Sequence, residues 1–344
     1  MPLIPFDTLV DFGTRLLVAK GAPEDAARQV ATIAAETEAW GIPTHGVRVY
    51  EYFEHFIGSG LDPTAQPRVV KEKGATAIVD GAGAFGQLAM KLATETALAR
   101  AREFGVGMVS VPETFWIAGL AVYMIPIAEA AMFGELWVQH SSGKDCAPFG
   151  GIAPRLSTNP LALAFPTPDG GAMISDFSTS AIAMGKVGPK IRAGETFDED
   201  LFVDRDGKLT NDPSVMRKGG SMLFFGGAKR GYKGFAMSLW AEALTAMSGG
   251  RTNNPDNPSR QACHLTVIDP EAFAGSDAYL AEMQGFLARV KTSPLRPGFT
   301  KIRIPGERGR SALAEARAKG VALCDDAIAA LNGIAAANGV AGVT

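Results

Sequence analysis

Cysteine and histidine are scarce in this chain of 344 residues. Its three cysteines, Cys146, Cys263 and Cys324, are widely separated and odd in number, which excludes a disulfide framework and a CxxC metal or redox motif. We therefore expect a reducing, cytoplasmic compartment. The sequence also lacks an HExxH motif, a Cys/His cluster and a GxSxG elbow, so we expect no metal site and disfavour a hydrolase.

Long hydrophobic runs and clustered basic residues are missing as well. The longest apolar run, Trp116 to Ala128, has about 13 residues and contains Pro126, whereas a membrane span needs about 20. The N-terminus lacks the basic region and apolar core of a signal peptide. Lys and Arg are scattered and the formal net charge is −3, so no basic stripe is available for a phosphate backbone. We expect a soluble protein with neither a membrane nor a nucleic-acid partner.

Apolar residues recur with helical spacing in several segments. This spacing predicts helices at Phe6–Ala19 and Glu24–Trp40, and the sequence Gly41-Ile42-Pro43 ends the second one. Thr44 is expected to cap a third helix, with His45 in its first turn. Further helices are expected at residues 87–104, 235–247 and 311–336.

Short runs rich in β-branched and apolar residues predict strands between these helices. The runs are ATAIVD, GMVSV, ELWVQ, LALAFP, AMISDF, HLTVID and FTKIRIPGE. Residues 188–220 are polar and rich in glycine, which predicts a long surface excursion, and residues 251–260 predict a polar loop. The length and the mixture of elements indicate two domains or one large α/β unit.

Glycine is abundant, with 40 residues, and one glycine-rich turn has the pattern of a dinucleotide-binding motif. Gly81-x-Gly83-x-x-Gly86 follows a predicted strand and opens a helix, as in a Rossmann fold. Asp80, however, would bring a carboxylate close to the pyrophosphate, and Glu113 is about 30 residues beyond Gly83 rather than about 20. We favour a tight packing turn and keep the cofactor site as the alternative.

A second glycine-rich turn, residues 226–234, carries Lys229, Arg230 and Lys233 at the start of a predicted helix. Free backbone N–H groups, the helix dipole and these cations together favour an anion site over a solvated basic loop. Tyr232 stands where a Walker A loop has its lysine, which excludes that motif.

His45 has the setting most typical of an acid/base residue among the four histidines. The Thr44 hydroxyl can fix its ring, the helix dipole disfavours the imidazolium form, and Gly46 is expected to leave space for a ligand. The alternative is a surface histidine at a helix start. His55 is expected to be a packing or surface residue.

Five short motifs follow one another along nearly the whole chain. They are Pro43-Thr44-His45-Gly46-Val47, Ser157-Thr158-Asn159-Pro160, Ser175-Asp176-Phe177-Ser178-Thr179-Ser180, Gly231-Tyr232-Lys233-Gly234 and Pro305-Gly306-Glu307. In this order they resemble the second, non-Rossmann type of the malate/L-lactate dehydrogenase family. That family includes sulfolactate and ureidoglycolate dehydrogenases, diketogulonate reductase and the piperideine/pyrroline-2-carboxylate reductases.

The resemblance implies an α/β, non-Rossmann fold that binds NAD(P). A helical N-terminal part, residues 1–75, would be joined by C-terminal helices within residues 311–344. Residues 76–310 would form a central mixed β-sheet domain with flanking helices. The resemblance also implies a homodimer that acts on a small-molecule substrate.

The resemblance further implies roles for individual residues. His45 would donate a proton in reduction and accept one in oxidation, with Thr44 as its hydroxyl neighbour and the nicotinamide as the source of hydride. Arg48, Thr158 and Lys186 are expected to contact substrate. The expected cofactor-binding residues are Trp116, Ile117, Ala118, Gly119, Leu120, Asp176, Phe177, Ser178, Tyr232, Lys233, Gly306, Glu307 and Arg308.

The chain departs from the family pattern in three places. Val49 stands where the family carries an arginine that pairs with the substrate carboxylate, and Arg48 is rotated from that position by about 100° on a helix. Thr114 and Trp116 replace a histidine and a glycine, so this wall of the pocket is expected to be more crowded and less polar. Lys186 replaces the aspartate of the imine-reducing branch.

We therefore predict an oxidoreductase that interconverts a 2-oxo acid and a 2-hydroxy acid with NAD or NADP. NADPH is slightly favoured because Lys229, Arg230, Arg308 and Arg310 are available for a 2′-phosphate. The alternatives are a reductase of cyclic imino acids, a family member that binds cofactor without catalysis, and a Rossmann dehydrogenase.

Overall fold

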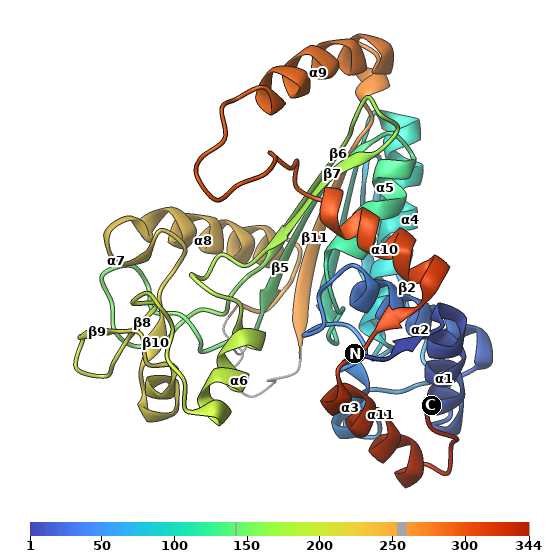
Figure 1. Ribbon diagram of the computed structural model, residues 1–344. Helices are drawn as coiled ribbons and strands as arrows, with labels where there is room; N and C mark the ends of the chain where they lie inside the picture. Colours follow the sequence, from blue (N-terminus) through green and yellow to red (C-terminus); the bar gives the residue numbers. More distant parts are fainter. Residues whose placement is uncertain (142, 253–259, 344) are drawn as a thin grey trace.

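The computed structural model describes residues 1–141, 143–252 and 260–343. The polar loop expected at residues 251–260 therefore lies largely outside the described residues. In the described part of the chain, the main feature is a seven-stranded sheet with the order β2-β3-β4-β11-β5-β6-β7 (Figure 1). Its strands are β2 Arg68–Lys73, β3 Thr76–Asp80, β4 Val106–Thr114, β5 Phe133–His140, β6 Leu161–Pro166, β7 Ala172–Phe177 and β11 Gln261–Ile268.

The sheet is mixed. β3 and β4 run parallel, and every other neighbouring pair is antiparallel. The parallel pair is joined by helix α4, Gly86–Phe104, as a parallel connection requires. Thus the prediction of an α/β fold with a central mixed sheet is confirmed.

Helices cover both faces of this sheet. On one face α4 packs against β3 and β4, and α5, Ala121–Glu129, packs against β5, β6 and β7. On the other face α8, Tyr232–Met247, packs against β4, β5 and β11. Figure 1 shows α8 on the side of the sheet opposite to α4 and α5.

The N-terminal helices add a further layer outside α4 and α5. Helix α1, Phe6–Ala19, packs along α2, Glu24–Ala39, and both match the periodicity of the sequence. Each begins directly after a proline, and Gly21 between them has a φ of 93°, a left-handed conformation that suits glycine. Their alanine-rich and aromatic inner faces belong to the same apolar core as the inner side of the sheet.

The third helix differs from its prediction. Helix α3 covers Val49–Phe56, whereas residues 44–48 form turns before it. His45 N–H donates to the Ile42 carbonyl at 3.0 Å, and Val49 N–H donates to the Gly46 carbonyl at 3.0 Å. His45 therefore lies in a turn that leads into the helix rather than in its first turn.

The segment predicted as a surface excursion is instead a small lobe with its own core. It contains α6 Met184–Ala193, β8 Phe202–Val203, β9 Leu209–Thr210, a 3-10 helix Pro213–Lys218 and β10 Ser221–Met222. Phe202 and Met222 are fully buried together with Cys146 and Val187. A short helix, α7 Gly227–Arg230, then leads to α8. The few apolar residues that lie between the glycines and charged residues of this segment therefore form a core, which its polar composition did not indicate.

The C-terminal third contains a long helix that was not predicted, and one of its predicted strands is wrong. Helix α9, Ser276–Lys291, projects beyond the end of the sheet (Figure 1). The run FTKIRIPGE, residues 299–307, was predicted as a strand but is irregular up to Gly306. It contacts β7 through one backbone hydrogen bond, in which the Ile174 N–H donates to the Pro305 carbonyl at 3.1 Å.

The expected helical region at residues 311–336 is two helices, α10 Glu307–Lys319 and α11 Asp325–Ala337. Between them, β12 Val321–Ala322 pairs with β1 Leu3–Ile4.

Candidate active site

His45 forms the centre of the candidate site. Its Nδ1 is 2.8 Å from the Thr44 hydroxyl oxygen, so these two neighbours share a hydrogen bond. Burial lowers the pKa of His45 from 6.5 to about 4, because the imidazolium form loses hydration there. The imidazole is therefore neutral at pH 7 and has one ring nitrogen, Nε2, left for another partner.

Aromatic side chains make up one wall beside His45. The Trp116 ring meets the His45 ring edge-on, with 5.1 Å between their centroids. The ring centroids of Trp116 and Tyr52, a residue of α3, are 5.2 Å apart. The Tyr52 hydroxyl accepts a hydrogen bond from the backbone N–H of Trp116 at 3.4 Å. Trp116 thus lies between His45 and the aromatic side of α3.

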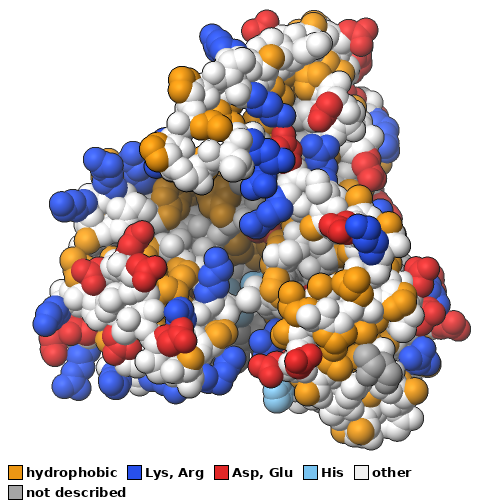
Figure 2. All heavy atoms as spheres, viewed as in Figure 1, with side chains coloured by type: hydrophobic (Ala, Val, Ile, Leu, Met, Phe, Trp, Pro, Cys, Tyr) orange, Lys and Arg blue, Asp and Glu red, His pale blue; other side chains and the backbone are white. Residues whose placement is uncertain are grey.

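The small lobe supplies a second wall. A Cβ on Gly185 would lie only 2.6 Å from the Cβ of Thr44, so the backbone of α6 approaches the Thr44–His45 pair more closely than a side chain would permit. Lys186 follows directly and is exposed. Two sequence-distant segments therefore meet at Thr44, the hydrogen-bond partner of His45. The face of the molecule in Figure 2 is hollowed between this lobe and the rest of the chain.

Arg48 and Val49, at the start of α3, differ in burial. Arg48 is exposed, and its Nε is 3.2 Å from Glu51 Oε1. Val49 is fully buried in the apolar core. Arg48 is consequently engaged in a surface ion pair with Glu51 of α3.

Gly46 has a different role from the expected one. A Cβ at this position would lie 2.8 Å from the Cα of Glu38 on α2. The Glu38 carboxylate accepts a hydrogen bond from the Val47 N–H at 3.1 Å. Gly46 therefore permits the turn to pack against α2, and the expectation that it leaves space for a ligand is wrong.

Asp176 supports the segment Trp116–Leu120. Its carboxylate accepts hydrogen bonds from the Leu120 N–H at 2.9 Å and the Ala121 N–H at 3.0 Å, at the start of α5. Burial nevertheless raises the pKa of Asp176 to about 6, and these two hydrogen bonds oppose the rise. The structure thus brings together two segments that the sequence assigned to the cofactor.

The other residues of the Trp116–Leu120 segment are tightly held. Ile117 N–H donates to Gln261 Oε1 at 3.1 Å, and its carbonyl accepts from the Tyr123 hydroxyl. Ala118 has a φ of 72°, which is unusual for a residue with a Cβ. A Cβ on Gly119 would lie 2.8 Å from Thr37 Cγ2.

Gly306, Glu307 and Arg308 lie beside the strand that carries Asp176. Gly306 has a φ of 91°, and a Cβ there would be 2.6 Å from the Ile174 backbone nitrogen. Lys291 lies 2.7 Å from the Glu307 carboxylate and lowers its pKa. Arg308 is exposed. The predicted cofactor segments 176–178 and 306–308 are therefore neighbours in space, because the first begins on β7 and the second packs against the backbone of β7.

Phe177 and Ser178 continue from Asp176. Phe177 is 37% exposed and its ring lies 6.5 Å from that of Phe225. The Ser178 hydroxyl accepts a hydrogen bond from Ser180 at 2.9 Å. Phe177 thus keeps part of its ring open to solvent.

Thr158 is held in place by hydrogen bonds to its backbone carbonyl and by the side chain of the next residue, Asn159. Its carbonyl accepts hydrogen bonds from the Thr179 N–H at 2.9 Å and the Thr179 hydroxyl at 2.8 Å. Asn159 has a φ of 31°, and its side-chain amide donates to Ser238 Oγ and to Glu242 Oε1, each at 2.9 Å. Asn159 therefore anchors this turn to α8.

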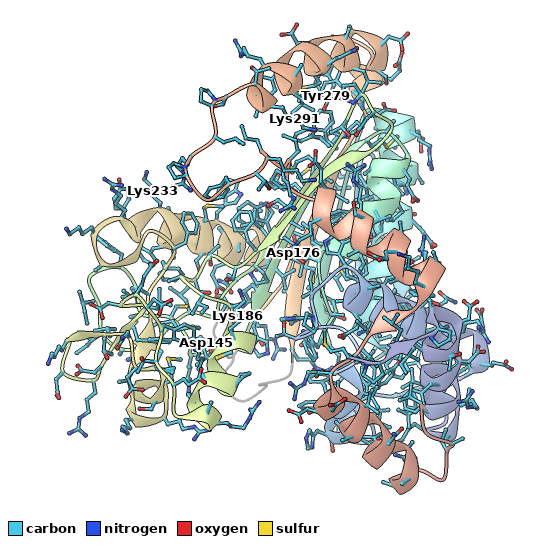
Figure 3. The ribbon with its side chains drawn as sticks, viewed as in Figure 1. Asp145, Asp176, Lys186, Lys233, Tyr279 and Lys291 are labelled. Atoms are coloured by element: carbon cyan, nitrogen blue, oxygen red, sulfur yellow. The ribbon has the colours of Figure 1, made fainter. Side chains whose placement is uncertain are left out.

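Tyr232 and Lys233 begin α8 at some distance from this group. Tyr232 is 51% exposed and its ring lies 5.8 Å from Phe149. Figure 3 shows Lys233 well away from Asp176 and Lys186, which both lie nearer the middle of the molecule. The predicted cofactor residues are therefore spread over a long surface.

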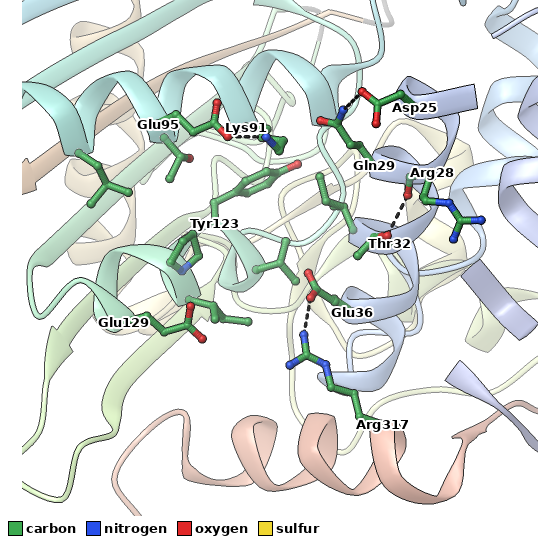
Figure 4. A pocket seen from close by; sticks show the side chains of 16 residues that line it. Asp25, Arg28, Gln29, Thr32, Glu36, Lys91, Glu95, Tyr123, Glu129 and Arg317 are labelled. Carbon is green, nitrogen blue, oxygen red and sulfur yellow. Dashed lines mark hydrogen bonds and ion pairs between the residues drawn. The ribbon is translucent and has the colours of Figure 1, made fainter. Parts of the chain in front are cut away.

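A separate cavity of about 420 Å³ lies between α2, α4, α5 and α10 (Figure 4). It contains none of the residues predicted for the site. Within the described ranges no group of three or more His, Cys, Asp or Glu side chains is arranged to hold a metal ion. The described helices include none that is long and apolar enough to cross a membrane.

Comparison with known proteins identifies the family. A model of the malate/L-lactate dehydrogenase family matches residues 4–332. The chain belongs to this family. It is therefore an enzyme of an oxidoreductase family, and the family resemblance predicted from the five motifs is confirmed.

Relatives of the malate/L-lactate dehydrogenase family match this chain over almost their whole length. A malate dehydrogenase of Pyrococcus abyssi is 31% identical over 99% of this chain and 96% of its own. A Delta(1)-pyrroline-2-carboxylate/Delta(1)-piperideine-2-carboxylate reductase of Pseudomonas putida is 28% identical over 95% of each chain. The solved malate dehydrogenase of Pyrococcus horikoshii OT3 has a TM-score of 0.87 at 28% identity and covers 99% of this chain and 97% of its own.

The malate/L-lactate dehydrogenase fold also explains the first glycine-rich turn. The mixed, mostly antiparallel sheet is not the doubly wound parallel sheet of a Rossmann dehydrogenase, so that alternative is wrong. Cβ atoms on Gly81 and Gly86 would each lie 2.7 Å from a backbone carbonyl oxygen, that of Glu113 and that of Trp116 respectively. These glycines allow the turn to pack against the end of β4.

Sequence reasoning missed two contacts of this family member. Tyr52 was not singled out, although it lies seven positions after His45 on a predicted helix. The approach of Gly185 to Thr44 joins residues about 140 positions apart, and no local pattern could have shown it.

Proposed function

We propose that this chain is an NAD(P)-dependent dehydrogenase that interconverts a 2-oxo acid and a 2-hydroxy acid. The observation that carries the proposal is the pairing of His45 with Thr44 in a desolvated turn, beside Trp116 and against the backbone of α6. This supplies one neutral, oriented imidazole whose second nitrogen bonds to no other described residue, which is what acid/base chemistry at a carbonyl needs.

His45 acts as the acid/base group in this proposal. A hydrogen bond between Nδ1 and Thr44 leaves Nε2 to exchange a proton with substrate. In oxidation the neutral ring accepts the hydroxyl proton of a 2-hydroxy acid. In reduction it donates a proton to the oxygen of the 2-oxo acid, and the carboxylate of that substrate raises the histidine pKa from its low value in the free enzyme.

The residues present fit a nicotinamide dinucleotide, which supplies or receives the hydride when bound. The partly exposed rings of Phe177 and Tyr232 offer flat surfaces for aromatic groups. Lys233 and Arg308 form no ion pair within the part of the chain that the structure describes, so both are available for phosphates. The Asp176 carboxylate holds the Trp116–Leu120 segment along which the nicotinamide would lie.

NADPH is proposed as the slightly preferred cofactor, with Arg308 available for its 2′-phosphate. Arg308→Ala should then weaken NADPH binding several-fold and leave NADH binding nearly unchanged. Fluorescence titration with both nucleotides measures this difference. Equal losses of affinity for NADH and NADPH would show that Arg308 binds a part of the cofactor that both nucleotides have.

Lys186 and Thr158 are proposed to contact the substrate. Lys186 is exposed, it carries no ion pair among the described residues, and it follows the glycine that contacts Thr44. Thr158 is held in place by Thr179 and by the anchored Asn159. Arg48 is less well placed, because it pairs with Glu51.

The test follows nicotinamide absorbance with NADH or NADPH and a panel of 2-oxo acids. The wild type should turn over at least one of them, and His45→Gln should lose most of that turnover while retaining nucleotide binding. His55→Gln, a change at an exposed histidine of α3, serves as the matched control. Undiminished turnover in His45→Gln would remove His45 from the mechanism.

A reductase of cyclic imino acids is the second candidate, and the Pseudomonas putida relative supports it. The lysine at position 186 opposes it, since the imine-reducing branch has an aspartate there. Including pyrroline-2-carboxylate in the panel separates the two. A protein that binds nucleotide but converts neither class would be the family member without catalysis.

We also propose that the enzyme is a cytoplasmic homodimer. Leu239, Trp240 and Met247 on α8 are 47%, 56% and 69% exposed, and such apolar side chains favour a protein contact. The three free cysteines are consistent with a reducing compartment. Light scattering coupled to size-exclusion chromatography tests the dimer, and Trp240→Lys should weaken it.

A further inference from the structure

The aromatic wall beside His45 and the distribution of charge around it carry one inference about substrate choice. Trp116 contacts His45, Tyr52 contacts Trp116, and Tyr52 continues to Phe56 with 4.3 Å between ring centroids. Trp116 and Tyr52 are each only partly buried. A substrate bound at His45 therefore faces apolar ring surface on this side.

The basic residues beside this aromatic wall form ion pairs with glutamates. Arg48 pairs with Glu51 at 3.2 Å on the outer side of α3. Arg260 pairs with Glu113 at 3.2 Å, and its guanidinium lies 3.6 Å over the ring of Phe115. The position next to Arg48 is the fully buried Val49. The wall thus offers apolar surface and no unpaired positive charge among its described residues.

Lys186 directly follows Gly185, the residue of α6 that contacts Thr44, and it carries no ion pair among the described residues. One ammonium can neutralise one carboxylate, and every 2-oxo acid has one at C1. A second carboxylate on the substrate would face Trp116 and Tyr52, where the neighbouring cation, Arg260, is already paired with Glu113, and it would lose hydration against the aromatic rings.

We infer that the substrate is a 2-oxo or 2-hydroxy monocarboxylic acid with an apolar side chain, and that dicarboxylic acids are disfavoured. This inference rests on the proposed function, since it assigns the substrate class of the same site. Lys186 binds the C1 carboxylate, and the apolar side chain of the substrate lies against Trp116 and Tyr52.

A matched pair of substrates tests the inference. 2-Oxopentanoate and 2-oxoglutarate have the same carbon skeleton and differ only in whether the far end is a methyl group or a carboxylate. The expected ratio of their kcat/KM values is at least about 10-fold in favour of 2-oxopentanoate, because an uncompensated charge is penalised in a partly buried site. A ratio near one, or a preference for 2-oxoglutarate, would overturn the inference.

Two variants make the assignment specific. Trp116→Lys places a cation beside His45 and should shift the ratio toward 2-oxoglutarate by about 10-fold, measured as a ratio so that a general loss of rate cancels. Phe104→Lys, at an exposed aromatic residue at the end of α4, should leave the wild-type ratio unchanged. An unchanged ratio in Trp116→Lys would show that this wall does not contact the side chain of the substrate.

Binding measurements keep this inference separate from the proposed reaction. Dissociation constants of both acids, measured by calorimetry in the presence of NAD⁺ or NADP⁺, report the preference without turnover. Tighter binding of 2-oxopentanoate in a protein that turns over no 2-oxo acid of the panel would support the inference and refute the proposed function. Equal binding of the two acids would refute the inference even in an active enzyme.

Discussion

Replacing Trp116 by alanine should change the protonation of His45, because the indole is one of the groups that exclude water from the imidazole. The rings meet edge-on at 5.1 Å, and burial lowers the histidine pKa from 6.5 to about 4. At about 1.4 kcal/mol for each pKa unit, this shift corresponds to roughly 3 kcal/mol against the imidazolium form. Admitting water should return at least about one unit, so the pKa of His45 rises to about 5 or above.

Proton NMR titration of the histidine ring signals measures this change directly. The chain has four histidines, and His45→Gln identifies the signal of interest by its loss. In the wild type this signal should stay in its neutral position from pH 8 to about pH 5. In Trp116→Ala it should begin to titrate at a higher pH.

Phe104→Ala provides the control, since Phe104 is an exposed aromatic residue at the end of α4. It should leave the His45 titration as in the wild type. A His45 pKa near 6.5 in the wild type would refute the burial argument itself. A pKa that stays near 4 in Trp116→Ala would assign the desolvation to groups other than the indole.

Three further substitutions follow from the same site. Thr44→Val removes the partner of His45 Nδ1 and should lower kcat by about 10- to 100-fold with little change in Tm, as steady-state assays and thermal melts will show. Val49→Arg places an unpaired charge in a fully buried position and should lower the free energy of unfolding by several kcal/mol, measured by urea denaturation, rather than improve substrate binding. Gly46→Ala should destabilise by about 1–3 kcal/mol, because its Cβ would meet Glu38; Gly285→Ala in α9, with no heavy atom within 4 Å, should be neutral or slightly stabilising. A stable, more active Val49→Arg enzyme or a harmless Gly46→Ala change would contradict this account of the turn.

Much of the fold could be predicted where the pattern of one segment decides its structure. Helix α1 has the bounds that the apolar periodicity predicted, and strands β5, β6 and β7 formed at the expected runs. The prediction for FTKIRIPGE failed because a strand needs a neighbour to pair with, and this segment makes an irregular contact with β7 instead. The core of the small lobe joins Cys146 to Phe202 and Met222, and such distant contacts are invisible to local reasoning.

In the candidate site, too, contacts between adjacent residues could be predicted from the sequence, and contacts between distant segments could not. The Thr44–His45 hydrogen bond joins adjacent residues, so the sequence was sufficient to suggest it. The role of Gly46 could not be read from the turn alone, because it depends on Glu38 of another helix. The support that Asp176 gives to the start of α5 also depends on the fold, since these residues are more than 50 positions apart.

The place of β11 in the sheet has a consequence for synthesis of the chain. Residues 261–268 pair with β4 on one side and with β5 on the other, and these two strands do not pair with each other. Until the ribosome has delivered this late segment, the sheet exists only as two three-stranded pieces, each with an unpaired apolar edge. A nascent chain that stops short of residue 261 therefore exposes two unpaired strand edges, an arrangement that favours aggregation.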